Sequence, residues 1–192
     1  IVWPENQDEY FDNLSLYHST NLLYWNLIHY TEGLIITEFD HDYVSTNLEN
    51  YYSIIQQDTC GYYSDTSIVH SPIVLQLNSS NFQEVSLDWS HYIGWDVIDF
   101  YNVFRSFDDQ EYELIGTVSG DSSRYLDQNL CNISYTYYVE ANHSGNQFVS
   151  RSNSPSIEPL FIDFSVPINL SYTSVIDNQY ISFIGKYSRI FI

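Results

Sequence analysis

The chain has 192 residues, enough for one large domain or two small ones, and 25 Asp and Glu against five Lys and Arg give a formal net charge of −20. Such a surface repels phosphate, which argues against nucleic acid as a partner and disfavours anionic membranes. With 44% hydrophobic residues, 19 Tyr and 11 Phe, the chain can build a packed core, which argues against acidic disorder.

Hydropathy and periodicity indicate an all-β protein. No apolar run reaches the 18 residues of a transmembrane helix, and the first ten residues lack the basic start and long apolar segment of a signal peptide. No stretch shows sustained helical periodicity, so we expect almost no helix. The carboxylates are interpreted as a solvated acidic surface, with calcium binding by some of them as the alternative.

Segments of the first half of the chain recur in the second half. Three pairs match: 14–19 with 101–106 and 24–28 with 111–115, both at an offset of 87 residues, and 51–61 with 135–145 at an offset of 84. In the same alignment Trp3 corresponds to Trp89. A period of this size is one sandwich domain, so we predict two copies, residues 1–70 and 71–158.

The first copy is expected to be incomplete. Trp3 stands at the chain start, so the strand that should precede it has no residues here. We therefore expect the chain to be part of a longer protein. An exposed sheet edge invites pairing, so upstream residues or a partner should cover it.

The junction between the copies is short. His70, Ser71 and Pro72 interrupt the last strand of the first copy, and Ile73 begins the second. Because so few residues separate the copies, we expect them to be stacked end to end with little freedom.

The second copy shows the clearest strand pattern. Val85, Leu87 and Trp89 alternate with polar residues, the period of a strand with one buried face. Further strands are predicted at 73–77, 100–104, 112–118, 123–127, 135–141 and near 148–152. Residues 159–192 form a partial third β unit, too short for a core of its own. It is either the front half of another sandwich or a strand pair on the second domain.

The core positions resemble those of a known fold. Trp89 on an early strand, Tyr101 on the next, and Tyr137, Val139 and Ala141 on a late strand are placed as in immunoglobulin-like sandwiches. The pattern resembles the fibronectin type III domain. The resemblance implies an all-β fold of tandem fibronectin type III sandwiches.

Three motifs extend the resemblance to surface proteins of gliding Bacteroidetes that use the type IX secretion system. These are the strand ending in Asp58-Thr-Cys-Gly61 with its exit through His70-Ser-Pro, the turn Trp89-Ser-His-Tyr-Ile-Gly-Trp95, and the passage from Ser150 to Ile162. That last passage is similar to the entry into a C-terminal sorting domain. Residues 163–169 depart from the usual opening of that domain. The resemblance implies an outer-surface or secreted protein.

Two aromatic residues are the candidate binding site. Tyr92 and Trp95 lie in the turn after the Trp89 strand, where exposed rings could stack on a sugar or bind a protein partner. The alternative is that Trp95 folds back onto its own domain or onto the junction.

No catalytic or metal site is predicted. The densest acidic spots, residues 39–42 and 108–109, match no calcium motif and are interpreted as polar turns. The six His are scattered in sequence without a ligand spacing, and no Gly-x-Ser-x-Gly motif is present. Cys60 and Cys131 fall at distant ends of the two copies, so we predict no disulfide between them.

The chain is thus predicted to be a non-enzymatic spacer or adhesin segment at the outer cell surface. Its partners would be proteins, with neighbouring repeats and secretion machinery as candidates, and it needs no cofactor. Two alternatives stay open: a glycan-binding accessory module of a larger secreted enzyme, and a eukaryotic receptor ectodomain. The sequence lacks the Trp-Ser-x-Trp-Ser box of cytokine receptors, which argues against the receptor alternative.

Overall fold

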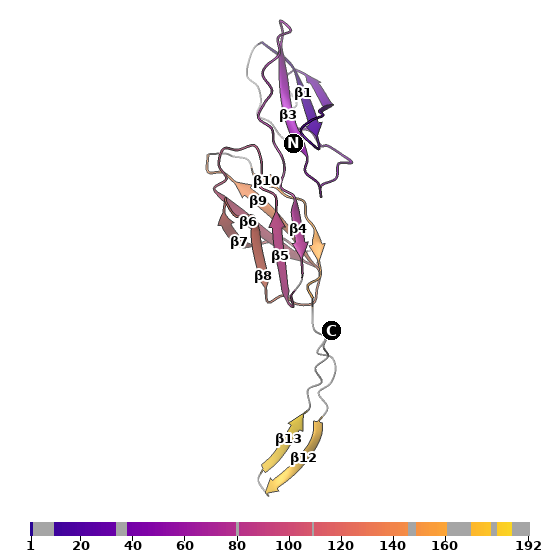
Figure 1. The fold of residues 1–192 in the computed structure, drawn as a ribbon, viewed down its shortest axis with the longest axis vertical. Helices are drawn as coiled ribbons and strands as arrows, with labels where there is room; N and C mark the ends of the chain where they lie inside the picture. Colours follow the sequence, from indigo (N-terminus) through magenta and orange to yellow (C-terminus); the bar gives the residue numbers. More distant parts are fainter. Residues whose placement is uncertain are drawn as a thin grey trace. The chain divides into compact units, whose positions relative to one another are not determined.

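The computed structural model describes residues 1, 10–33, 38–79, 81–108, 110–145 and 149–160, and the backbone of two strands within 170–185. Residues 1–160 and 161–192 form two compact units. Every regular element in the described ranges is a strand, in agreement with the all-β fold predicted from the sequence (Figure 1). No helix of the described residues is long and apolar enough to cross a membrane.

A three-stranded antiparallel sheet, here called the N-terminal sheet, forms the first part of the chain. It consists of β1 (Phe11–Ser19), β2 (Asn26–Glu32) and β3 (Tyr51–Asp58) in the order β2-β1-β3. Leu14, Leu16 and Tyr52 are buried on one face of this sheet and form its core. Their spacing of two along β1 is what places both leucines on that face.

The segment after β3 pairs with β3 irregularly. Ser64 and Ser67 donate their amides to the carbonyls of Gln56 and Ile54, each at 2.9 Å. His70 then exchanges two backbone hydrogen bonds with Tyr52. Partners on this segment recur every third residue, whereas partners on β3 recur every second, so the segment forms bridges rather than a continuous strand.

The second part of the chain is a sandwich of two antiparallel sheets. One sheet has the order β4-β5-β8, made of β4 (Leu75–Asn78), β5 (Glu84–Trp89) and β8 (Arg124–Gln128). The other has the order β10-β9-β6-β7, made of β6 (Phe100–Phe107), β7 (Glu113–Ser119), β9 (Tyr135–Asn142) and β10 (Ser150–Arg151), with β11 (Ser156–Ile157) also on β9.

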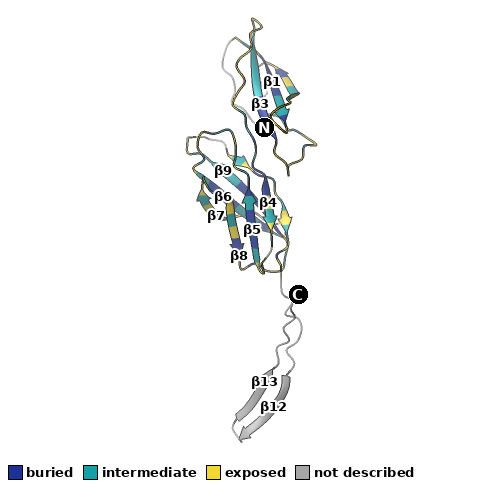
Figure 2. Ribbon diagram, viewed as in Figure 1, coloured by how far each residue is buried: buried dark blue, intermediate teal, exposed yellow. Residues whose placement is uncertain are grey.

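The sandwich core is built from alternate residues of facing strands. Val85 and Leu87 of β5 are fully buried, as are Tyr101 and Val103 of β6 (Figure 2). The Trp89 ring lies 5.5 Å from that of Tyr101, centroid to centroid, at an edge-to-face angle. A three-stranded sheet facing a sheet in which β10 and β11 both pair with β9 is the arrangement of a fibronectin type III domain, so the predicted fold class is confirmed.

Strand registers relate the N-terminal sheet to the sandwich residue by residue. Leu16 is paired with Ile54 as Val103 is paired with Val139, so β1 and β6 are offset by 87 residues, the difference between 16 and 103. Both strands carry an irregularity directly after these positions. The offset between β3 and β9, from 54 to 139, is 85 residues, one more than sequence matching indicated.

A hydrogen-bonded pair next to the N-terminal sheet extends this relation. The Ile1 amine donates to the Phe39 carbonyl and the Phe39 amide donates back to the Ile1 carbonyl, both at 2.9 Å. The corresponding pair in the sandwich is Leu87 and Tyr125, across β5 and β8. Leu87 lies 86 residues after Ile1, and Tyr125 lies 86 residues after Phe39. Trp3, the predicted counterpart of Trp89, lies outside the described residues.

Residues 161–192 contain an antiparallel pair, β12 (Leu170–Asp177) and β13 (Tyr180–Gly185). An isolated two-stranded pair is marginally stable. Its identity as the start of a sorting domain or of another repeat stays a prediction, as do the domain boundaries at residues 70 and 158.

Candidate functional site

The loop after β5 carries both predicted binding residues and reaches the junction between the N-terminal sheet and the sandwich. Ser71 and Ile93 exchange two backbone hydrogen bonds, at 2.9 and 3.2 Å. Gly94 has a φ of +136° and a Cβ there would lie 2.3 Å from the His70 ring. Only glycine therefore lets the loop approach the junction this closely.

Tyr92 binds the junction through its hydroxyl, which lies 2.5 Å from His70 Nδ1. Burial raises the pKa of Tyr92 to about 12 and lowers the pKa of His70. Near neutral pH, Tyr92 therefore keeps its proton, and its O–H donates a hydrogen bond to the neutral imidazole. The Tyr92 amide in turn donates to the hydroxyl of Tyr101 at 3.1 Å.

Trp95 is partly buried and packs at the periphery of the sandwich core. Its ring lies 4.5 Å from that of Tyr92 and 6.1 Å from that of His143, centroid to centroid. The structure thus brings Tyr92 and Trp95 together and packs both against the sandwich and its junction. Ligand binding by these residues stays a prediction.

Tyr92 and Trp95 also line a cavity of about 1000 Å³ beside the core face of the N-terminal sheet. Leu14, Leu16 and Tyr52 belong to the same lining. The polar side chains around the cavity are those of Ser53, Gln56, Ser64, Asp65, Ser67, His70, Ser150 and Arg151. Aromatic rings beside polar side chains provide the chemistry that a sugar ring or an apolar side chain of a partner can bind.

The predicted acidic spots do not gather into a metal site. Asp108 is exposed in a turn after β6, and Asp109 lies outside the described residues. Within the part of the chain that the structure describes, no three His, Cys, Asp or Glu side chains come close enough to hold a metal ion. Cys60 and Cys131 are both free and exposed.

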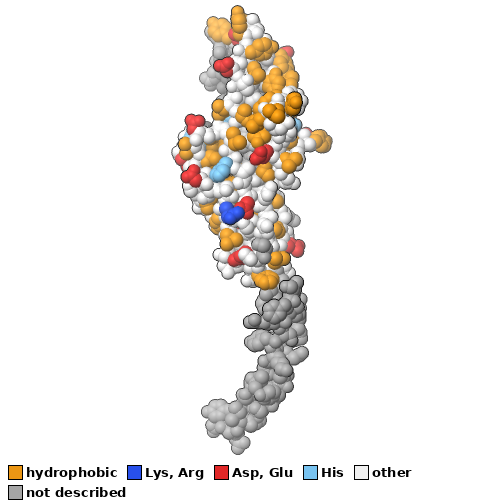
Figure 3. All heavy atoms as spheres, in the orientation of Figure 1, with side chains coloured by type: hydrophobic (Ala, Val, Ile, Leu, Met, Phe, Trp, Pro, Cys, Tyr) orange, Lys and Arg blue, Asp and Glu red, His pale blue; other side chains and the backbone are white. Residues whose placement is uncertain are grey.

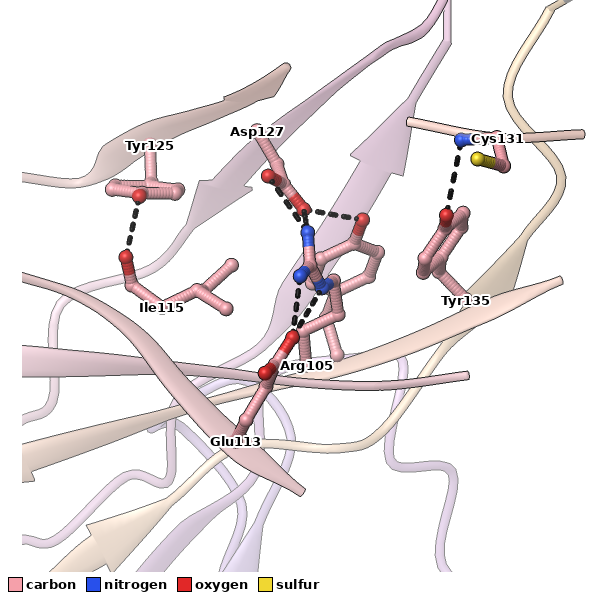
Figure 4. A network of polar contacts seen from close by, with 8 residues as sticks. Arg105, Glu113, Ile115, Tyr125, Asp127, Cys131 and Tyr135 are labelled. Atoms are coloured by element: carbon pink, nitrogen blue, oxygen red, sulfur yellow. Dashed lines mark hydrogen bonds and ion pairs between the residues drawn. The ribbon is translucent and has the colours of Figure 1, made fainter. Parts of the chain in front are cut away.

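A polar network inside the sandwich was not predicted from the sequence (Figure 4). Arg105 of β6 forms ion pairs with Glu113 of β7 and, at 3.0 Å, with Asp127 of β8. The hydroxyl of Tyr137 on β9 donates to Asp127 Oδ2 at 2.9 Å. The network connects four strands from both sheets.

Burial and charge shift the titration of this network. Burial raises the pKa of Tyr137, and the neighbouring Asp127 carboxylate raises it further. Burial alone lowers the pKa of Arg105, but the hydrogen bonds to Glu113 and Asp127 outweigh it and the pKa is raised. Near neutral pH, Tyr137 thus keeps its proton and Arg105 its positive charge.

Three histidines that are scattered in the sequence come together at the N-terminal sheet. The rings of His18 and His41 lie 4.8 Å apart, centroid to centroid, in an edge-to-face arrangement. His41 Nδ1 lies 3.1 Å from the hydroxyl of Tyr52. His29 stacks on Phe39 at 4.5 Å in the same cluster. No local sequence signal brings these residues together.

No protein-family model matches the chain, and no curated protein matches its sequence. Among solved structures, it is similar to a two-domain fibronectin type III segment of chicken tenascin, with 14% identity, a TM-score of 0.38, and coverage of 82% of this chain and 89% of that one. It is also similar to the FN1-FN3 domains of chicken CNTN1, with 14% identity, a TM-score of 0.39, and coverage of 83% and 59%.

A further similar structure is pectate lyase Pel3 from Pectobacterium carotovorum. The identity is 20% and the TM-score 0.40, with coverage of 52% of this chain and 30% of that one. The chain thus spans less than a third of the pectate lyase chain.

Proposed function

We propose that the chain is a non-enzymatic extracellular segment of a larger surface protein, in which the sandwich and the N-terminal sheet act as stiff spacer or adhesive modules. The observation that carries this proposal is the junction. His70 is paired with Tyr52 of the N-terminal sheet, and the next residue, Ser71, is paired with Ile93 of the sandwich loop. No unpaired residue separates the two pairs, so the junction has no flexible linker.

The surface supports an extracellular role. Acidic side chains are spread over the molecule, and hydrophobic side chains gather over the N-terminal sheet on the face that Figure 3 shows. A net charge of −20 keeps such a protein soluble in spite of its exposed aromatic residues. Fibronectin type III domains are commonly extracellular, which agrees with this placement. The exposed rings are suited to protein partners.

The two native cysteines allow a direct test of stiffness. Cys60 follows β3 of the N-terminal sheet and Cys131 follows β8 of the sandwich, and both are free and exposed. Spin labels on both thiols of the unmodified sequence report the distance between the modules by double electron–electron resonance. We expect one narrow distance distribution.

The matched control is a variant with four glycines inserted between His70 and Ser71, which should broaden that distribution. An equally broad distribution in the natural sequence would contradict a stiff spacer. Single-label samples of Cys60→Ser and Cys131→Ser exclude distances that arise from association of two chains.

Export by a type IX secretion system is the more specific part of this proposal, and it rests on the sequence resemblance. In a gliding bacterium that carries this system, the parent protein should be accessible to an impermeant biotin reagent on intact cells. Deletion of the system should remove this labelling. Labelling that persists without the system argues against type IX export while leaving the spacer role in place.

The aromatic cavity favours a second candidate, glycan binding by Tyr92 and Trp95 in an accessory module. Binding on a glycan array that is lost in Trp95→Ala supports this function. Tyr24→Ala, which removes an exposed ring elsewhere, is the matched control. Absence of any binding, or binding that Trp95→Ala leaves unchanged, contradicts it.

A further inference from the structure

Strand register makes His18 the counterpart of Arg105. His18 is paired with Tyr52 across β1 and β3, as Arg105 is paired with Tyr137 across β6 and β9. His18 and Arg105 are 87 residues apart, the offset that holds along both strands. The N-terminal sheet thus carries an imidazole where the sandwich carries a permanent cation.

His41 takes the place of Asp127 by the same reasoning. It follows Phe39 by two residues, as Asp127 follows Tyr125 by two, and Phe39 and Tyr125 are equivalent in pairing. The contact with the tyrosine hydroxyl is also shared: Tyr52 lies 3.1 Å from His41 Nδ1, and Tyr137 lies 2.9 Å from Asp127 Oδ2.

The two sites therefore differ in the charges that they bring together. In the sandwich, opposite charges attract between Arg105 and Asp127. At the N-terminal sheet two imidazoles face each other, and protonation of both would give two like charges. With ring centroids 4.8 Å apart, these charges repel in a partly desolvated environment.

Hydrogen bonding identifies the proton that His18 already holds. Asn50 donates both amide hydrogens, to the carbonyls of Ser45 and Leu48, and its Oδ1 lies 2.9 Å from His18 Nε2. Oδ1 can only accept, so His18 donates from Nε2 and would take a second proton at Nδ1.

The other groups around the pair offer little compensation. Tyr52 on β3 is neutral at these pH values, and burial raises its pKa. His29 on β2 stacks on Phe39, which in turn lies against His41, so a third imidazole belongs to the cluster. Burial and the neighbouring His18 lower the pKa of His41, and together they outweigh the Asp42 carboxylate, which raises it.

We propose that the His18–His41 pair makes the N-terminal sheet an acid-sensitive element, which loosens below about pH 6.5 while the sandwich remains folded. For a base that takes up protons less readily when folded, stability is complete above the unfolded pKa, about 6.5, and falls as the pH drops below it. Carboxylates ordinarily titrate below about pH 5, so a response in this window points to histidine.

Hydrogen exchange of the full chain tests the proposal by region. After correction for the intrinsic pH dependence of exchange, peptides from β1 and β3 should exchange several-fold faster at pH 5.5 than at pH 7.5, because protonation that the folded state disfavours shifts the opening equilibrium. Peptides from β6 and β9 serve as the internal control and should not change. Equal protection of β1 and β3 at both pH values would overturn the proposal.

Variants separate the pair from other titrating groups. Replacement of both residues by the sandwich pair, His18→Arg with His41→Asp, should abolish the response, and His41→Gln alone should reduce it. His91→Gln, outside the cluster, is the matched control and should leave it unchanged. A response of undiminished size in His41→Gln would overturn the proposal.

Titration of the natural protein followed by NMR signals of the imidazoles needs no variant. His41 should titrate below its unfolded value, and an unshifted titration curve counts against the proposal even if every variant fails to fold.

Discussion

The hydroxyl of Ser152 accepts a hydrogen bond from the buried amide of Val139 at 2.9 Å, while the Ser152 amide donates to the Val139 carbonyl. The same pair occurs in the N-terminal sheet, where the Ser67 hydroxyl accepts from Ile54 at 2.9 Å in an exposed position. Ser152 follows β10 and Ser67 lies in the segment after β3, so both serines are at points where the chain departs from regular strand pairing. A side-chain oxygen thus replaces the backbone acceptor that the irregular segment cannot place there.

Ser152→Ala should destabilise the sandwich by about 1 to 3 kcal/mol, because it leaves the buried Val139 amide without its side-chain acceptor. Ser67→Ala is the natural control and should cost less than about 1 kcal/mol, since water can reach the exposed Ile54 amide. Urea unfolding followed by tryptophan fluorescence measures both changes. Equal costs would show that burial of the amide is not what matters.

Removal of the buried Asp127 carboxylate should lower the stability of the sandwich more than removal of the exposed Glu113 carboxylate, which binds the same Arg105. The Asp127 side chain is 9% exposed and the Glu113 side chain 52%. Asp127→Ala leaves Arg105 and the Tyr137 hydroxyl without their buried partner, so we expect a loss of about 3 kcal/mol. Glu113→Ala should cost less than about 1 kcal/mol. Thermal unfolding at pH 7 gives the comparison, and the reverse order would contradict the placement of Asp127 at the centre of the network.

Gly94→Ala should loosen the junction, because its Cβ would collide with the His70 ring and its φ of +136° disfavours any side chain. We expect a broader distance distribution between labels on Cys60 and Cys131. Gly33→Ala is the control with a positive φ of +77° and open space around its Cβ. A distribution in Gly94→Ala as narrow as in the natural sequence would show that the loop does not hold the junction.

Calcium should not contribute to stability, because the described carboxylates form no group that could coordinate the ion. The melting midpoint should be the same in 1 mM calcium and in excess EGTA, with both samples at equal ionic strength. A midpoint that rises with calcium would require a site that includes residues outside the described ranges.

Much of the sandwich was predictable because its strands repeat apolar residues at every second position. Val85, Leu87 and Trp89 are buried as that alternation predicts, and the offset of 87 residues between β1 and β6 follows from matching sequence alone. Local periodicity is sufficient for these features, because a strand packed on one face needs an apolar side chain at each inward position.

The irregular edge after β3 was harder to predict. Ser64, Ser67 and His70 meet β3 at steps of three residues, so neither the strand period nor the helix period describes them. The edge of the sandwich is also interrupted. Pro155 separates β10 from β11, because proline lacks the amide that a continuous ladder requires.

The polar clusters depended on the tertiary structure. Arg105 and Asp127 lie 22 residues apart on strands of the two facing sheets, and His18 and His41, 23 residues apart, lie on β1 and on the segment that precedes β3. Likewise, the partly buried position of Trp95 follows from its packing on the sandwich core and against the rings of Tyr92 and His143. Alternation along a strand decides which side chains point inward, whereas the strands that face each other decide which of those side chains meet.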